Sequence, residues 1–440
     1  MFLKSITPIK HITFRNLLLS GIVLAAFACT TTTEEPQQQV TEVHQHRSAK
    51  RGVSYSFSIL DDAKLLSPGV SWFYNWGPDV SSSLNVAVTD GKIDFFPMAW
   101  NGGFDATRIR NYKAAHPECE YILGFNEPNL TDQANMTPTV AAQKWAPLAA
   151  LAKELNMKII SPAMNYGTLA GYGDPIVWLD EFFTKVPLSE IDGIAIHCYM
   201  GNAGALASYV KRFKKYGKPI WMTEFCAWEK NITNVAAQMN FMSEAVNYLE
   251  CNADVARYAW FIPRSSGAVE TYPYMQLLTK TTPYDLSALG KVFVNMSTLD
   301  KTVYYPETQQ IPAEHYSSLS MEEAVTSGNW GTPVHLRLTT DVDGVLDVTD
   351  LNSDMWLEYL VQTTTITNPK IELRYASLYN ANISILVDGM AVATVTLPKT
   401  NADNVWSTMS TALPMSIGKH TIRILNTYGG TSLNWIRITK

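Results

Sequence analysis

The sequence has no long run of lysine or arginine, and its 34 basic residues are outnumbered by 40 acidic ones, for a formal net charge of -6. Proteins that bind nucleic acid usually carry a basic surface that contacts phosphates, so this charge pattern argues against a nucleic-acid partner. The eight histidines show no His-x-x-x-His spacing. The cysteine spacings match no paired-cysteine metal site either, so we assign no metal to a catalytic site.

Cysteine is scarce as well, with five in the chain. Cys119, Cys198, Cys226 and Cys251 are expected to be free thiols, because isolated cysteines usually behave as small buried hydrophobic residues. An oxidising compartment would allow one disulfide, and the spacing does not say which two cysteines would form it.

The N-terminus lacks an apolar run long enough to cross a bilayer, yet it has the features of an export signal. Lys4, Lys10 and Arg15 are basic, residues 17–27 are apolar, and Ala-Phe-Ala directly precedes Cys29. This segment resembles a bacterial lipoprotein signal, which implies removal of residues 1–28 and lipidation of Cys29. An ordinary secretory signal is the alternative. We expect a lipid-anchored protein of the bacterial cell envelope, at the outer membrane or cell surface.

Composition and length predict two folded domains after a flexible tether. Hydrophobic residues make up 46% of the chain and charged residues 17%, which suits a large core, and 440 residues exceed the usual size of one domain. Residues 29–51 are rich in Thr, Gln and Glu and lack periodic apolar residues, so we expect a tether there. We place the domains at 52–303 and 304–440, and we expect a monomer.

The first domain alternates short β-rich runs with helical patterns, which is typical of repeated βα units around a parallel sheet. Helical periodicity is clearest over 139–155, 203–216 and 234–249. The predicted strands number eight, which favours an α/β fold of the (β/α)8 TIM-barrel class. They cover residues 52–57, 70–76, 94–100, 120–127, 158–163, 193–199, 219–225 and 257–262.

The second domain shows short alternating strands without long helices, which favours an all-β sandwich of the jelly-roll type. Asp388-Gly389 is a hairpin-turn signal between two of the strands. The predicted strands cover residues 370–376, 382–387, 391–397, 420–425 and 434–439.

Two glutamates stand at the ends of predicted barrel strands. Glu127 ends the fourth strand in the run Gly-Phe-Asn-Glu-Pro-Asn, and Glu224 lies near the end of the seventh in Trp-Met-Thr-Glu-Phe. The carboxyl ends of barrel strands carry the chemistry of this fold. Two opposed carboxylates are what glycoside hydrolysis needs, because one protonates the leaving oxygen while the other captures the sugar cation. An isolated strand-end glutamate is more often a structural ion-pair partner, so the pair matters.

Several motifs in one order resemble glycoside hydrolase family 128, over residues 52–295. They are Ser-Trp-Phe-Tyr-Asn-Trp (71–76), Phe-Pro-Met-Ala-Trp (96–100), Gly-Phe-Asn-Glu-Pro-Asn (124–129), Ser-Pro-Ala (161–163), Trp-Leu-Asp (178–180), Ile-His-Cys-Tyr (196–199) and Trp-Met-Thr-Glu-Phe (221–225). The resemblance implies a clan A barrel that acts on β-1,3-glucan with retention of configuration. It assigns Glu127 as the acid/base and Glu224 as the nucleophile.

Polar neighbours of the two glutamates are candidate binding residues. Asn126 is expected to contact the sugar 2-hydroxyl, a role that the resemblance supports. His197 and Tyr199 alternate along the sixth strand, so both should face the site. We expect Glu127 to have a raised pKa, from burial and from the charge of Glu224, so that it can act as an acid.

Aromatic residues near strand ends are candidate platforms for sugar rings. They are Trp72, Trp100, Trp228 and Trp260. Asn75, Trp76 and Asn129 are further candidates that the family resemblance implies. Residues 263–285, with three tyrosines, are expected to shape one end of the cleft.

The second domain resembles a family-6 carbohydrate-binding module. The motifs are Ile-Pro-Ala-Glu-His-Tyr (311–316), Trp-Leu-Glu-Tyr (356–359), Leu-Arg-Tyr (373–375), Val-Asp-Gly (387–389), Leu-Pro-Lys-Thr (397–400), Trp-Ser-Thr (406–408) and Asn-Trp-Ile (434–436). The resemblance implies a structural calcium ion near Glu314, although Asn434 stands where that family has Asp. A sandwich that has lost glycan binding is the alternative.

Three functions follow as hypotheses. The leading one is a retaining hydrolase of β-1,3-glucan such as laminarin or curdlan. The others are a glycan-binding surface lipoprotein without turnover, and a clan A glycosidase for another β-linked polysaccharide. All three have a carbohydrate partner, and none calls for a catalytic cofactor.

Overall fold

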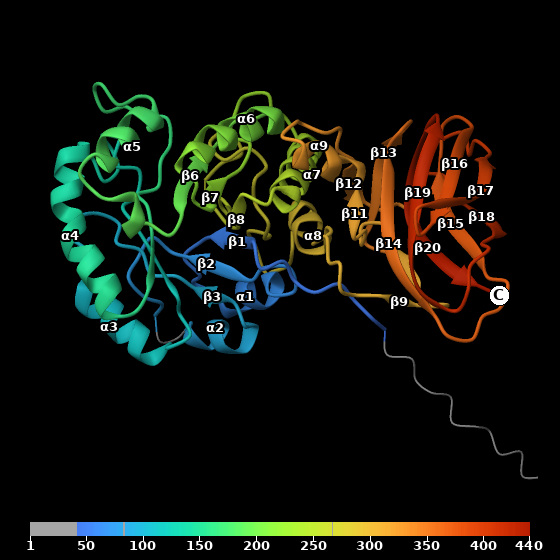
Figure 1. Cartoon of the computed structure of the whole chain (residues 1–440), viewed down its shortest axis with the longest axis horizontal. Coiled ribbons are helices and arrows are strands. Elements are labelled where there is room, and N and C mark those ends of the chain that lie inside the picture. Colours follow the sequence, from blue (N-terminus) through green and yellow to red (C-terminus); the bar gives the residue numbers. More distant parts are fainter. Residues whose placement is uncertain (1–41, 82–83, 266) are drawn as a thin grey trace, which may run out of the picture. The chain divides into compact units, whose positions relative to one another are not determined.

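Eight parallel strands form a barrel in the computed structural model, which describes residues 42–81, 84–265 and 267–440 (Figure 1). They are β1 (Arg51–Ser54), β2 (Trp72–Tyr74), β3 (Asp94–Phe95), β4 (Tyr121–Leu123), β5 (Lys158–Ile160), β6 (Ile194–Cys198), β7 (Ile220–Phe225) and β8 (Val255–Trp260). Strands β3, β2, β1, β8, β7 and β6 pair in this order, and β4 pairs with β5. Parallel bridges from Met98 to Leu123 and from Met164 to Ile196 join the two groups. The barrel prediction is confirmed.

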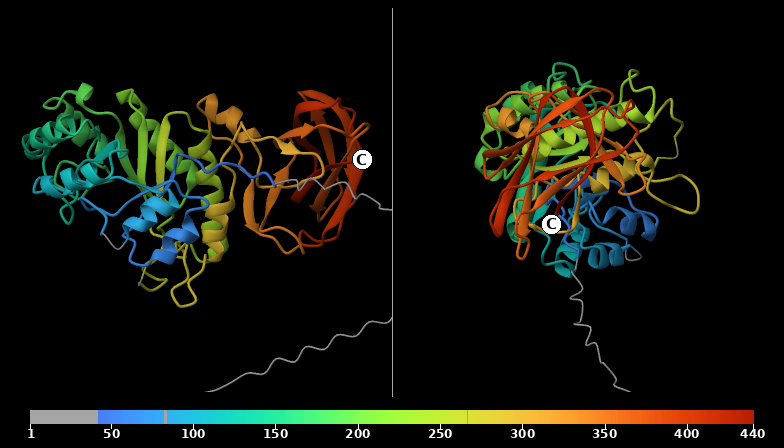
Figure 2. Two further views of the ribbon diagram at one scale, coloured as in Figure 1. Left: turned by 90° about the horizontal axis from the view of Figure 1, so that it is seen from below. Right: turned by 90° about the vertical axis from the view of Figure 1, so that its right-hand side faces the viewer.

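Helices lie on the outer side of these strands (Figures 1 and 2). Thr137, Asn202 and Asn234 cap α4, α6 and α7, because each side chain accepts a backbone N–H of the first turn. The three predicted helices are confirmed, although the second ends in the 3-10 turn η2. The bounds are α1 (Leu60–Leu66), α2 (Asn85–Gly91), α3 (Ala106–Ala115), α4 (Pro138–Glu154), α5 (Pro175–Phe183), η1 (Leu188–Glu190), α6 (Ala203–Phe213), η2 (Lys214–Tyr216), α7 (Val235–Cys251) and α8 (Ala288–Asn295).

Aromatic rings surround the guanidinium of Arg257 in the interior of the barrel. The guanidinium carbon lies 5.9 Å from the ring centre of Trp72, 5.3 Å from that of Trp221 and 5.0 Å from that of Phe96. Trp72 and Trp221 are fully buried. A Cβ atom at Gly52 would lie 2.4 Å from the Trp72 indole, so glycine makes room for that ring. These contacts fill the barrel interior with a packed core.

The C-terminal part is a sandwich of two mainly antiparallel sheets, as predicted. One sheet has the order β12, β13, β20, β15, β18, with β10 beside β20; the other has β11, β14, β19, β16, β17, with β9 beside β14. Asp388 and Gly389 both have positive φ in the turn between β16 and β17. The bounds are β9 (Tyr305–Pro306), β10 (Gln310–Pro312), β11 (Ser318–Leu319), α9 (Ser320–Thr326), β12 (His335–Leu338), β13 (Leu346–Asn352), β14 (Trp356–Thr363), β15 (Lys370–Ala376), β16 (Ala381–Val387), β17 (Met390–Leu397), β18 (Ser407–Ala412), β19 (Gly418–Tyr428) and β20 (Gly430–Thr439).

Residues 43–51 are ordered against the folded chain, unlike the tether expected there. The Arg47 guanidinium donates to the backbone oxygens of Ser67 at 2.8 Å and Val70 at 3.0 Å. Val43 donates its N–H to Gln309 at 3.0 Å. These bonds give the segment specific partners, which offset the entropy lost on ordering. The rest of the tether, the export signal and Cys29 lie outside the described residues.

The four cysteines of the described ranges are free, as expected. Cys119, Cys198 and Cys226 are buried, and Cys251 is half-buried. None of the helices in these ranges combines the length and the apolar character needed to cross a bilayer.

A buried ion pair ties the start of the barrel to its seventh helix. Arg51 Nη2 lies 3.2 Å from Glu250 Oε1, and both side chains are almost fully buried. The same carboxylate accepts hydrogen bonds from Tyr258 at 2.5 Å and Ser48 at 2.8 Å.

We predict that Glu250→Ala lowers the free energy of unfolding by about 3–5 kcal/mol, because it leaves the Arg51 charge buried without its counter-ion. The matched control is Glu154→Ala, which removes an exposed pair with Arg110 that solvent screens, and its unfolding midpoint should stay close to that of the unmodified protein. Chemical denaturation followed by tryptophan fluorescence measures both. Equal midpoints for the two variants would contradict the prediction.

Candidate active site

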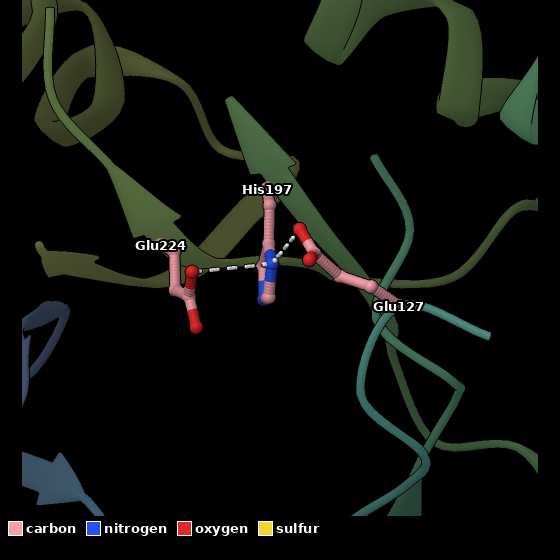
Figure 3. Close-up of side chains that lie close together, drawn as sticks. All are labelled: Glu127, His197 and Glu224. Carbon is pink, nitrogen blue, oxygen red and sulfur yellow. Dashed lines mark hydrogen bonds and ion pairs between the residues drawn. The ribbon is translucent and has the colours of Figure 1, made fainter. Parts of the chain in front are cut away.

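Glu127 and Glu224 face the same space at the carboxyl ends of the barrel strands, with His197 of β6 between them (Figure 3). Glu127 follows β4, and Glu224 lies in β7, one residue before the end of the strand. One carboxylate oxygen from each glutamate and one ring nitrogen of His197 all lie within 4.8 Å of one another. Carboxyl groups about 5 to 5.5 Å apart are typical of retaining glycosidases, whereas inverting enzymes separate them by about 6.5 to 9.5 Å.

Glu224 accepts hydrogen bonds from three aromatic residues. Tyr74 and Trp76 donate to Oε1, each at 2.7 Å, and Tyr199 donates to Oε2. Burial and the charge of Glu224 raise the pKa values of Tyr74 and Tyr199 well above 10, so both hydroxyls keep their protons. These donors suit an ionised carboxylate, which can only accept hydrogen bonds.

Glu127 interacts with His197 and Asn165. His197 Nδ1 lies 2.8 Å from Glu127 Oε1, and Asn165 Nδ2 donates to the same oxygen at 3.1 Å. Burial raises the pKa of Glu127, whereas the hydrogen bond and the charge of His197 lower it. The lowering effects together outweigh burial, so the net pKa lies below the usual 4.5. The expected raised pKa is therefore wrong for the free protein.

His197 shows the complementary change. Burial lowers its pKa, whereas the negative charge of Glu224 and the hydrogen bond to Glu127 raise it, and the net pKa lies above 6.5. Glu127 and the buried imidazole of His197 therefore compete for the proton that a general acid needs, and we describe this proton as shared between them. His197 contacts both glutamates and Tyr199 contacts Glu224, while their expected binding of sugar stays a prediction.

Two residues of the site have left-handed backbone conformations. Glu127 has a φ of 43° and Trp76 a φ of 60°. Such values are uncommon for residues other than glycine and cost free energy, so surrounding bonds must hold them. For Glu127 these include the N–H donated to Ala163 at 3.0 Å and the carbonyl that accepts from Leu130 at 3.0 Å.

A cavity of about 420 Å³ opens over the two carboxylates. Of the predicted site residues, it brings together Glu127, Glu224, Asn126, Tyr199, Trp76, Trp100 and Trp228. Asn126 Nδ2 donates to Gln133 at 3.1 Å, while its buried Oδ1 has no partner among the described residues. This buried oxygen lies beside the cavity that Asn126 lines.

Besides His197, which is fully buried between the two glutamates, four predicted binding residues do not line this cavity. Trp72 and Trp260 are completely buried, and Trp260 Nε1 donates to the Met275 carbonyl at 2.7 Å, so neither ring can stack on a sugar. Asn75 uses its side chain on the backbone of Asp79 and Gly77. Asn129 is fully buried and donates to the Asn165 carbonyl at 2.7 Å. All four support the structure beneath or beside the site.

Trp228 lines the cavity but also packs inside the protein. Its ring stacks on that of Phe261, with centroids 5.6 Å apart, and lies tilted by 34° against that of Tyr272, with centroids 5.2 Å apart. Its Nε1 donates to the Thr271 carbonyl at 2.7 Å. The segment 263–285 thus contacts the cavity wall through Trp228, as expected for a segment that shapes one end.

Sequence reasoning missed Tyr74, Asn165, Gln133 and Phe261. Strict alternation along the second strand puts Tyr74 on the same side as Trp72 and Trp76, and this signal could have found it. Asn165 follows the fifth strand and could have been found by the same strand-end argument that gave the two glutamates.

The same cluster also has the spacing of a metal site, since Glu127, His197 and Glu224 are all metal-ligand types. However, Tyr74, Trp76, Tyr199 and Asn165 direct hydrogen bonds at the carboxylate oxygens that a metal would use. This donor set favours acid–base and nucleophilic chemistry by the carboxylates themselves over coordination of a metal.

Comparison with known proteins agrees with this geometry. A model described as the glycosyl hydrolase catalytic core matches residues 52–293, which is more than half of the chain. A model of carbohydrate-binding module family 35 matches residues 329–438, so the expected module is found but the assignment to family 6 is corrected to family 35.

Two solved structures are similar to the barrel. A family 128 (subgroup II) endo-β-1,3-glucanase from Pseudomonas viridiflava is 38% identical, with a TM-score of 0.52 over 56% of this chain and 98% of that one. A family 128 (subgroup II) endo-β-1,3-glucanase from Sorangium cellulosum is 31% identical, with a TM-score of 0.50 over 56% and 97%.

A curated relative, the Alkali-sensitive linkage protein 1 of Schizosaccharomyces pombe, is 25% identical over 259 residues. The alignment covers 56% of this chain and 45% of that protein, so the chain spans less than half of its length. Together with the paired glutamates, these matches show that the chain belongs to the glycosyl hydrolase catalytic core family, within glycoside hydrolase family 128.

Proposed function

We propose that this protein hydrolyses β-1,3-glucan with retention of configuration, with Glu127 as acid/base and Glu224 as nucleophile. The observation that carries the proposal is the pair of buried carboxylates whose oxygens lie within 4.8 Å of each other in an open cavity. The substrate follows from the similar barrels, which are endo-β-1,3-glucanases.

In the first step, Glu127 gives its proton to the glycosidic oxygen while the bond from that oxygen to C1 breaks. A Glu224 oxygen forms a bond to C1 and gives a glycosyl-enzyme ester. The acid form of the Glu127–His197 pair has the shared proton on Glu127 and a neutral imidazole.

In the second step, Glu127 is a carboxylate and acts as the base. It takes a proton from water, the water oxygen bonds to C1, and the ester to Glu224 breaks. The protonated Glu127 and the ionised Glu224 are then restored, and the sugar leaves with its original configuration.

The cavity lining suits a glucan chain. Trp76 and Trp100 offer half-buried aromatic surface for the C–H faces of sugar rings. The free Oδ1 of Asn126 is placed to accept a hydrogen bond from a sugar hydroxyl. Such a contact to the 2-hydroxyl strengthens in the transition state.

We also propose that the protein is exported, lipid-anchored at Cys29 and monomeric, at the outer membrane or surface of a bacterial cell envelope. The support is the basic and apolar N-terminal segment before Cys29. Mass spectrometry of the membrane fraction would detect an acylated N-terminal cysteine, and an unmodified Cys29 or a different N-terminus would reject the anchor.

The C-terminal module has oxygen atoms suited to a structural calcium ion. Glu314 Oε2, Asp347 Oδ2 and Asn434 Oδ1 are all buried and have no hydrogen-bond partner among the described residues. Burial raises the pKa of Glu314 to about 8 and that of Asp347 to about 7, although Arg337 donates to Asp347 at 2.9 Å. Calcium prefers carboxylate and carbonyl oxygens, so we propose that these residues hold it and that it stabilises the sandwich.

The first prediction concerns the two glutamates. Glu127→Gln and Glu224→Gln should each lower kcat/KM on laminarin by about 100-fold or more, because each removes a group that takes part in bond cleavage. Glu154→Gln on the outer helix α4 is the control and should keep full activity. Nuclear magnetic resonance should show the β-anomer as the first product.

The same assay separates the competing functions. Release of the α-anomer first would reject retention. Turnover of β-1,4-glucan alone would reject the substrate, and no release from any glucan would favour a binding protein without turnover.

A second prediction concerns pH. Because the pKa of His197 is raised, the proton shared with Glu127 should stay bound at pH 6.5 and be lost only at higher pH. The alkaline limb of kcat/KM on laminarin should therefore lie above pH 6.5. In His197→Gln the proton rests on Glu127 alone, and the limb should move to lower pH. An unmoved limb would show that the two groups do not share a proton.

A third prediction tests the calcium site. Calcium should raise the unfolding temperature of the sandwich, and EDTA should reverse the rise, because an ion that binds the folded state stabilises it. Glu314→Gln should abolish the effect, while Glu372→Gln, at a partly exposed ion pair of β15, should keep it. Calorimetry measures the shift, and an equal response of both variants would reject this site.

A further inference from the structure

The two oxygens of the Glu127 carboxyl group have different surroundings. Oε1 lies 2.8 Å from His197 Nδ1 and accepts from Asn165 Nδ2 at 3.1 Å. Among the described residues, no donor contacts Oε2, although Glu127 lines the cavity. One oxygen is therefore engaged by the protein while the other remains available to a ligand.

The side-chain amide of Asn165 is held in one orientation. Its Oδ1 accepts from the backbone N–H of Tyr166 at 2.8 Å, so the Nδ2 group must face Glu127. Its backbone carbonyl accepts from Asn129 Nδ2 at 2.7 Å. Asn129 in turn accepts from the backbone N–H groups of Thr168 and Leu169 through its carbonyl. The loop after β4 and the loop after β5 are thereby joined behind Glu127.

We propose that Asn165 is a positioning residue for the acid: with His197 it occupies Oε1 and leaves Oε2 as the oxygen that carries the catalytic proton. The inference rests on the proposed function and deepens it. In a carboxylic acid one oxygen bears the proton while the other only accepts hydrogen bonds. Asn165 Nδ2 donates to Oε1, and His197 also donates to it when the ring proton is on Nδ1, so a proton on Oε1 is disfavoured in that tautomer.

The imidazole agrees with this assignment. In the acid form His197 donates its Nδ1–H to Oε1, and Nε2 is then a bare lone pair. The neutral ring carries its proton on Nδ1 rather than on Nε2, because Nε2 is buried and a proton there would have no acceptor among the described residues.

The proton route follows. The proton leaves Oε2 for the glycosidic oxygen as the C1–O bond breaks and Glu224 bonds to C1. Water returns a proton to Oε2 when its oxygen bonds to C1 and the Glu224 ester breaks. Asn165 gives up no proton in either step, and its hydrogen bond keeps Oε2 turned toward the cavity.

The test compares two substrates in Asn165→Ala. Laminarin has a sugar leaving group that must be protonated, whereas 2,4-dinitrophenyl β-laminaribioside has a leaving group that departs without a proton. We expect kcat/KM to fall about 10-fold on laminarin, as for the loss of one hydrogen bond to the acid, and to stay within about 2-fold on the aryl substrate. Equal loss on both substrates, or no loss on either, would overturn the proposal.

A second variant gives an independent readout. Asn165→Asp places a negative charge beside Oε1, which favours the protonated acid, so the alkaline limb on laminarin should move to higher pH. An unmoved limb would count against the positioning role, even if Asn165→Ala does not fold. Asn231→Ala is the control, since this exposed loop amide donates to a backbone carbonyl and not to a catalytic carboxylate, and kcat/KM should change on neither substrate.

Failure of the underlying function would look different. If Glu127→Gln kept full activity on laminarin, the proposed mechanism itself would be rejected. If Glu127→Gln were inactive on laminarin and Asn165→Ala were not selectively impaired, only the positioning role would be lost.

Discussion

The structure depends on holding two like charges close together in a buried space. Glu127 and Glu224 are each less than a tenth exposed, and their oxygens lie within 4.8 Å. Like charges at such a distance repel strongly away from water. The surrounding donors offset this repulsion, with three on Glu224 and two on Glu127. Much of the barrel mouth therefore serves to supply hydrogen bonds to two carboxylates.

The sequence was informative where a residue's role follows from its position on a strand. Short apolar, β-rich runs between helical patterns located the eight strands. The ends of the fourth and seventh strands gave Glu127 and Glu224. His197 and Tyr199 followed from the two-residue period of β6. In the sandwich, β9 to β14 and β18 were not predicted. The residues of β18 are alternately half-buried and exposed and carry no clear apolar pattern.

The sequence failed where depth along a strand or distance between loops decides. Trp72 and Trp260 were placed near strand ends, yet their rings lie in the packed interior, which a one-dimensional pattern cannot distinguish from the cavity. Asn129 and Asn165 are 36 residues apart and meet only because neighbouring parallel strands bring their loops together. The expected tether, residues 29–51, was too long at its C-terminal end. Residues 43–51 are held by side-chain hydrogen bonds such as those of Arg47, and these bonds leave no periodic apolar pattern in the sequence.

The aromatic cage around Arg257 has a consequence for the reaction medium. Trp72, Trp221 and Phe96 are buried and fill the barrel interior near the starts of the strands, on the side opposite to the two glutamates. The cavity that Glu127 and Glu224 line lies at the other end, so we expect the hydrolytic water to enter there, through the volume that the departing half of the glucan has vacated. The first product therefore has to leave the cavity before the hydrolytic water can enter it.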